Sequence, residues 1–315
     1  DTGDLTAPVS IGSGDSEVEA PPSDAARAVS TAISDDTDGF RETVHQRIKS
    51  SEIKAAEELP DLETIDWQDV SPAQEIPVPM TSGAASWPWI KRHIMDAGEL
   101  PPHKAVRIEE MINHFSYSKP DMIKHGGFSA SIELCQTPWN PLTRLLAVHV
   151  QALPGADVGN ASATLVINSD HVEKLRLLGY AAAINKNGKE SGGTAPAVAS
   201  RTHGNYVIYE LLIDPEDLPE SGKSLVSLTL GGDGALSAME PKNWTHASPD
   251  MRFASMIAAT GMILSDFPAQ GELSAARLAS MLDLVEKTDG PTQAEERNEA
   301  INLVRKALEI VHKAP

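Results

Sequence analysis

The chain has 315 residues, of which 45 are acidic and 26 are basic, and its formal net charge is −19. This charge argues against nucleic acid and anionic membranes as partners, because phosphate groups are bound by basic surfaces, and it suits a basic partner. The single cysteine, Cys135, excludes an intrachain disulfide and a zinc site with two or more cysteine ligands. No apolar run reaches the roughly 20 residues that a transmembrane helix needs.

The N-terminal segment, residues 1–80, carries most of the negative charge, with 18 acidic and 5 basic side chains. Residues 1–35 are rich in Asp, Ser, Ala, Gly and Pro and have few large apolar side chains. This composition is typical of disorder. Residues 39–58 have apolar residues at helical spacing and predict one amphipathic helix, whereas residues 59–80 form a Pro-rich acidic linker. We therefore expect segment 1–80 to be an acidic, mostly disordered arm.

The next part of the chain changes from helical to strand-like periodicity. Residues 85–97 predict a helix that ends at Gly98, and residues 103–116 predict a second helix. From Phe128 to Leu134 apolar and polar residues alternate, which indicates a half-buried strand, and another strand is expected over 144–150.

The remaining chain predicts strands first and helices last. Four further strands are expected at 162–168, 174–184, 205–213 and 223–230. Ser248-Pro249-Asp250 is a typical helix start, and three helices are expected at 249–266, 274–287 and 292–313. This order of elements predicts an α+β protein, in which a β-sandwich or curved antiparallel sheet is covered by a layer of helices from both ends of the chain.

Two stretches carry specific motifs. The first stretch contains Gly98-Glu99-Leu100-Pro101-Pro102, then AVRIEEMINHF over 105–115, and then Thr137-Pro138-Trp139-Asn140-Pro141. The second contains Arg176-Leu177-Leu178-Gly179-Tyr180, Tyr209-Glu210-Leu211 and SPDMRFASMIAATGMIL over 248–264. In this order they resemble the two regions that flank the metal-binding domain of bacterial von Willebrand factor A (VWA) proteins of the YfbK type.

The resemblance implies a domain organisation in which the VWA domain itself is missing. Residues 81–150 are similar to the N-terminal flanking region and residues 163–315 to the C-terminal one. The short loop 151–162 replaces the VWA domain, so that the strands on either side are free to join directly into one sheet. The VWA metal site needs a D-x-S-x-S loop, and the nearest string, Asp69-Val70-Ser71-Pro72-Ala73, lacks the second serine.

No motif of the chain predicts catalysis, a cofactor or a metal site. The G-x-S-x-G elbow of many hydrolases is absent from the sequence. Asp36-Thr37-Asp38-Gly39 is similar to part of a calcium loop, but the position of the closing glutamate is His45. His93, His103, His114 and His125 recur roughly every 11 residues, yet solvated or hydrogen-bonded histidines are the simpler interpretation.

These observations favour a non-enzymatic binding or scaffolding protein of an extracytoplasmic, cell-envelope assembly in bacteria. The expected partner is a protein, and a VWA-domain protein is one candidate. Trp244 is the first candidate for an interface residue, followed by Trp87 and Trp89, because tryptophans anchor many interfaces. Two alternatives remain: a hydrolase whose site is assembled from distant residues, and a regulatory partner of a full-length VWA protein.

Overall fold

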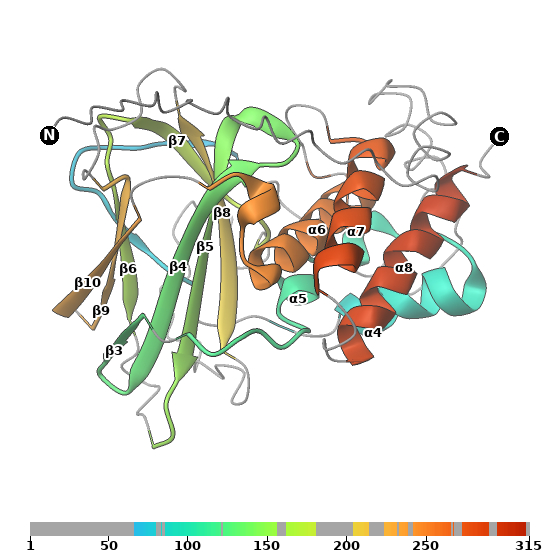
Figure 1. Cartoon of the computed structure of the whole chain (residues 1–315), viewed down its shortest axis with the longest axis horizontal. Helices are drawn as coiled ribbons and strands as arrows, with labels where there is room; N and C mark the ends of the chain where they lie inside the picture. Colours follow the sequence, from blue (N-terminus) through green and yellow to red (C-terminus); the bar gives the residue numbers. More distant parts are fainter. Residues whose placement is uncertain are drawn as a thin grey trace, which may run out of the picture.

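The computed structural model describes residues 66–79, 83, 86–120, 122–155, 162–180, 204–213, 224–231, 233–238, 242–265, 267, 273–289 and 295–312. It has three layers: a small sheet, a larger sheet beside it, and a group of helices on the far face of the larger sheet (Figure 1). The predicted α+β class is thereby confirmed. The expected disorder of 1–35, the expected helix 39–58 and the calcium-like string 36–39 lie outside the described residues.

The larger sheet has six antiparallel strands in the order β1-β7-β8-β5-β4-β3. In chain order its strands are β1 (Gln68–Asp69), β3 (Ile123–His125), β4 (Phe128–Thr137), β5 (Asn140–Ala152), β7 (Val172–Leu177) and β8 (Asn205–Ile213). The smaller sheet has four antiparallel strands in the order β10-β9-β6-β2. Its strands are β2 (Glu75–Pro77), β6 (Ala163–Ile167), β9 (Val226–Leu230) and β10 (Asp233–Ala238).

The alternation of side chains along the large sheet separates two hydrophobic cores. On β5, Leu146 and Val148 face the small sheet and belong to the sandwich core. Leu145 and Ala147 on the same strand face the helices and belong to the second core. Because both faces of the sheet are covered, β5 is buried continuously over residues 143–150 rather than at every second residue.

The helical layer is built around α6 (Pro249–Leu264), which is buried on almost every side. Ser248 caps this helix by accepting a hydrogen bond from the Met251 amide, as its start signal predicts. The surrounding helices are α4 (Ser86–Lys91), α5 (Ile108–Ile112), α7 (Ala275–Asp289) and α8 (Glu295–His312). Among the described residues, no helix combines the length and apolar character that crossing a membrane requires.

The predicted helix 85–97 is present but changes type along its length. Its second half, Arg92–Ala97, is a π-helix that ends at Gly98, where φ is 69°. The predicted helix 103–116 is shorter in the structure, because it consists of a 3-10 turn at His103–Ala105 and the five residues of α5.

Two expectations about the domain boundaries are wrong. Residues 66–79 were expected in the disordered arm, but they supply β1 and β2, and Val78 is buried in the sandwich core. The strands on either side of loop 151–162 do not join into one sheet, because β5 lies in the large sheet and β6 in the small one. The chain therefore crosses between the sheets here, and residues 156–161 of the loop lie outside the described residues.

Candidate binding site at the edge of strand β4

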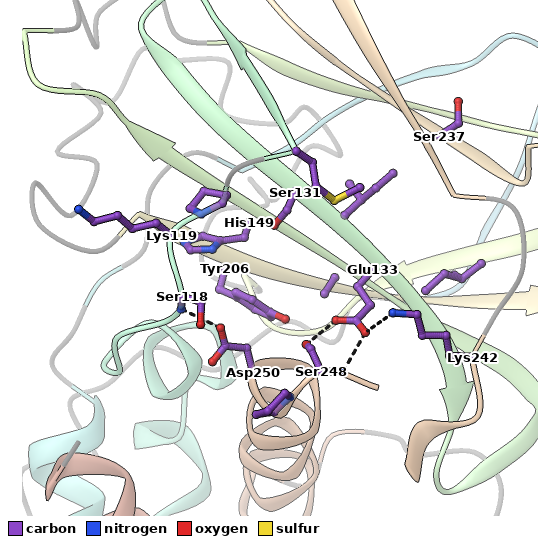
Figure 2. A pocket seen from close by; sticks show the side chains of 16 residues that line it. Ser118, Lys119, Ser131, Glu133, His149, Tyr206, Ser237, Lys242, Ser248 and Asp250 are labelled. Atoms are coloured by element: carbon purple, nitrogen blue, oxygen red, sulfur yellow. Dashed lines mark hydrogen bonds and ion pairs between the residues drawn. The ribbon is translucent and has the colours of Figure 1, made fainter. Parts of the chain in front are cut away.

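The main candidate site is a pocket of about 450 Å³ at the edge of the large sheet. Its walls come from residues 118–120 and 122, from β4 and β5, from β10, and from the start of α6 (Figure 2). The side chains that Figure 2 labels there are Ser118, Lys119, Ser131, Glu133, His149, Tyr206, Ser237, Lys242, Ser248 and Asp250.

Four consecutive residues of β4, 131–134, line this pocket. Successive side chains of a strand point to opposite faces of the sheet. Ser131 and Glu133 point to the helical side, whereas Ile132 and Leu134 belong to the sandwich side. A pocket that touches both sets must face the edge of the strand rather than one of its faces.

This edge of β4 is paired at both ends of the pocket. Strand β3 pairs with residues 128–130. Further along, the Lys242 amide donates to the Leu134 carbonyl, and the Gln136 amide donates to the Lys242 carbonyl. Within the described part of the chain, no strand pairs with this edge between Ala130 and Leu134.

Glu133 connects the sheet to the start of α6. Its carboxylate accepts hydrogen bonds from the Ser248 amide at 2.9 Å and from the Ser248 hydroxyl at 2.5 Å. Lys242 Nζ lies 3.3 Å from the same carboxylate and is itself more than half exposed, with 59 % of its side chain accessible. Glu133 therefore holds the N-cap of α6 against β4, and its charge is balanced within the pocket.

Asp250 has a similar structural role on the other wall. Its carboxylate accepts a hydrogen bond from the Ser118 amide at 2.7 Å and pairs with Arg297 at 2.5 Å. It lies in the first turn of α6, where a negative charge is favoured by the helix dipole. Asp250 therefore joins the segment before β3 to α6 and, through Arg297, to α8.

The floor of the pocket is aromatic. Tyr206 on β8 stacks on Tyr117, with ring centroids 4.2 Å apart, and lies 5.5 Å from the His149 ring. Figure 2 shows the Tyr206 hydroxyl pointing toward Glu133 and Ser248. Burial raises the pKa of Tyr206 well above its ordinary value, so this group is a neutral hydroxyl.

The motif residues Arg176 and Glu210 form a buried ion pair away from this pocket. Arg176 donates to Glu210 at 2.6 and 2.9 Å, and their side chains are only 2 % and 0 % exposed. The Thr143 hydroxyl donates to the other Glu210 oxygen at 2.7 Å. Arg176 also lies over the ring of Trp67, at 4.7 Å. The pair links β7 to β8 and to the N-terminal strand region, and its role is structural.

Gly179, in the motif Arg176–Tyr180, packs against α5, which lies in the motif over 105–115. A Cβ atom at Gly179 would lie 2.6 Å from the Glu109 amide nitrogen, and φ there is 95°. Burial raises the pKa of the Glu109 carboxyl, and a hydrogen bond from the backbone of Tyr180 partly opposes this rise. The glycine is therefore required by a close backbone approach as well as by its conformation.

The three tryptophans proposed as interface residues have different environments. Trp87 and Trp244 lie in the helical core, with 2 % and 7 % of their surface exposed. The Trp244 indole donates to the Ser255 hydroxyl at 2.8 Å. Both rings are thus core residues rather than surface anchors, and only Trp89 is partly exposed. The residues lining the pocket were not singled out from the sequence, because they come from separate elements without a local motif.

The structure gives no support to a metal or a reactive thiol in the described regions. No group of three or more potential ligands for a metal was found among these residues. Asp69, of the string similar to D-x-S-x-S, pairs with Lys174 at 3.1 Å. Cys135 is buried, and burial raises the pKa of its thiol, which opposes a nucleophilic role.

Two histidines are expected to make the fold less stable in acid. Burial lowers the pKa of His93 and His114 below the ordinary value of 6.5. Below about pH 6.5 the unfolded chain therefore binds more protons than the folded one, and stability falls as the pH falls. Glu109, with its raised pKa, has the opposite effect at lower pH.

We therefore expect a smaller loss of stability between about pH 7 and pH 5.5 in His114→Gln than in the wild type. The urea unfolding midpoint at both pH values measures this difference. Equal losses in the two proteins would show that His114 does not contribute.

The comparisons with known proteins agree with part of the resemblance seen in the sequence. A family model described as von Willebrand factor (vWF_A) matches residues 57–147. A search of curated proteins and a search of solved structures each found no significant match. The match begins before residue 81, where the flanking region was expected to start, and it covers strands β1 to β4 with part of β5. The chain therefore contains a von Willebrand A-like region at residues 57–147.

Proposed function

We propose that this protein is a non-enzymatic binding or scaffolding component of an extracytoplasmic assembly in bacteria, and that it binds a protein through the pocket at the edge of β4. We also propose that the chain is related to YfbK-type VWA proteins and that it has lost their metal-binding domain. A VWA-like region suggests protein interaction. The observation that carries the proposal is the stretch of β4 that opens into the pocket and has no strand partner among the described residues.

The chemistry of the pocket supports binding more than catalysis. Glu133 and Asp250 are each engaged in hydrogen bonds that hold α6 in place. A general acid or base has to change its protonation state during a reaction. Doing so here would weaken contacts on which the helical layer depends.

Affinity capture from native cells tests the proposal. The bait is the full chain, compared with Ser237→Arg, which places a large cation at the exposed β10 wall of the pocket. The matched control is Ser280→Arg, at an exposed position on α7. We expect a protein partner that wild type and Ser280→Arg retain and that Ser237→Arg loses by at least about tenfold, or 1.4 kcal/mol.

Repeating the capture with a chelator of divalent cations distinguishes metal-independent binding from pairing with a full-length VWA protein. Loss of the partner on chelation would favour the regulatory alternative, in which a carboxylate of this chain ligates the metal of its relative. A partner retained by Ser237→Arg, or no partner in any arm, would contradict the proposal.

A hydrolase is the second candidate, favoured by one observation. Ser131 and His149 are directly opposite each other on β4 and β5, and both line the pocket. No hydrogen bond between these two side chains is found in the described structure, although a nucleophile and its base need to be within hydrogen-bond reach. Labelling of the wild type, but not of Ser131→Ala, by a fluorophosphonate probe would support this candidate. No labelling would remove it.

A further inference from the structure

We propose that the pocket binds an extended, uncharged peptide segment of a partner protein, which adds to the edge of β4 as a short strand. This inference rests on the proposed function and names the partner's chemistry. Exposed edges of sheets are templates for pairing with another chain, and addition of a strand is a common mode of peptide recognition.

The direction of the backbone groups on β4 supports this mode. In an antiparallel ladder, alternate residues of a strand direct both N–H and C=O to the same neighbour. The Leu134 carbonyl and the Gln136 amide are directed outward to Lys242. Ile132, two residues earlier, therefore directs its N–H and C=O to the same edge, into the pocket that it lines.

The size of the gap limits the segment. The unpaired part of the edge extends from Ala130, the last residue paired with β3, to Leu134. Four steps at about 3.4 Å give a length of about 14 Å, which three or four extended residues fill. Strand β3 and Lys242 close its two ends, so that a long strand cannot extend along β4.

The two sides of the gap define which side chains fit. An added strand directs alternate side chains to opposite faces. On the sandwich side they meet Met122, which is 53 % exposed, and the apolar side chains of Ile132 and Leu134. On the helical side they meet the Ser131 and Tyr206 hydroxyls. The segment is therefore expected to alternate apolar residues with hydroxyl or amide residues.

The charges at the pocket indicate an uncharged segment. Glu133 is paired with Lys242, and Asp250 is paired with Arg297. Because both carboxylates also accept hydrogen bonds, a basic side chain gains no free counterion inside the gap. Lys119 is exposed to solvent, where an ion pair with an acidic side chain is worth little. Burying a charged side chain there without a partner would cost free energy.

Hydrogen exchange and peptide binding on the full chain test this inference. The probe is a fluorescein-labelled, amidated tripeptide of alternating valine and threonine, Val-Thr-Val. The matched probe is N-methylated at its central residue, which removes one backbone donor. We expect the first probe to bind and to slow exchange of the Ile132 and Leu134 amides, which face the edge, by at least about tenfold, and the methylated probe to bind at least about tenfold more weakly. Ser237→Arg is expected to abolish binding, whereas Ser280→Arg is not.

Three outcomes would overturn the inference: equal affinity for the two probes, slow exchange of the Ile132 amide in the free chain, and tighter binding of a peptide with the acidic sequence of residues 15–24. The first excludes backbone pairing, the second shows that the edge is already occupied, and the third identifies an acidic occupant. A pocket-dependent partner in native cells, without peptide binding, would refute only the peptide mode. Peptide binding without any native partner would refute only the proposed assembly.

Discussion

Replacing Glu210 by alanine is expected to lower the free energy of unfolding by about 3–5 kcal/mol, because it removes the carboxylate that forms the buried ion pair with Arg176. The Arg176 side chain is only 2 % exposed, so bulk water does not solvate its charge. The same change also removes one of the hydrogen-bond acceptors near the Thr143 hydroxyl. Guanidinium unfolding of the wild type and of Glu210→Ala measures the loss.

Two further variants separate the ion pair from a general effect of truncation. Glu286→Ala breaks an exposed pair with Arg305 and is expected to cost less than about 1 kcal/mol. The double variant Arg176→Met with Glu210→Leu removes both charges and is expected to recover much of the loss. A loss below about 1 kcal/mol in Glu210→Ala would contradict the structural role assigned to the pair.

Replacing Gly179 by alanine is expected to cost about 2–5 kcal/mol. Part of this cost is the strain of an alanine at a φ of 95°, which is about 1–2 kcal/mol. The rest is overpacking, about 1–3 kcal/mol, because the new methyl group would lie against the backbone of Glu109. Thermal unfolding monitored by circular dichroism measures the change.

Gly98→Ala is the matched control for this prediction. Gly98 also has a left-handed backbone, with φ of 69°, but no atom of the described residues lies within 4 Å of an added Cβ atom. This variant should show only the strain of about 1–2 kcal/mol. Equal losses at Gly98 and Gly179 would show that the close approach to Glu109 does not contribute.

The parts of the fold that the sequence predicts well are those with strong local signals. Strand β8 and strand β6 were expected within a residue or two of their observed ends. The start of α6 was also located, because Ser248 and Pro249 form a local cap that does not depend on the rest of the fold. Gly98 ended the preceding helix for a similar local reason.

The parts that the sequence does not predict depend on distant contacts. Strands β1 and β2 are two and three residues long in a polar segment, and only their pairing with β7 and β6 makes them strands. Strand β10 lies in a stretch for which no strand is predicted. The buried positions of Trp87 and Trp244 depend on packing among distant helices, which the residues next to each tryptophan do not reveal.

The candidate site also depends on contacts between distant parts of the chain, so the sequence does not predict it. Glu133 and Ser248 are 115 residues apart in the chain, and their contact forms only when α6 packs against β4. The open edge arises because β3 is short and because Lys242 returns to β4 several residues later. No periodicity within β4 itself indicates that three of its residues lack a neighbour on one side.

Photo-crosslinking in native cells tests the central claim most directly. A benzophenone amino acid is placed at Met122, which is 53 % exposed at the pocket, and in a second protein at Leu142, which is 54 % exposed on β5 and does not line the pocket. We expect a discrete adduct with another protein from position 122 and none from position 142. No adduct at 122, or the same adducts from both positions, would contradict a protein-binding site at the edge of β4.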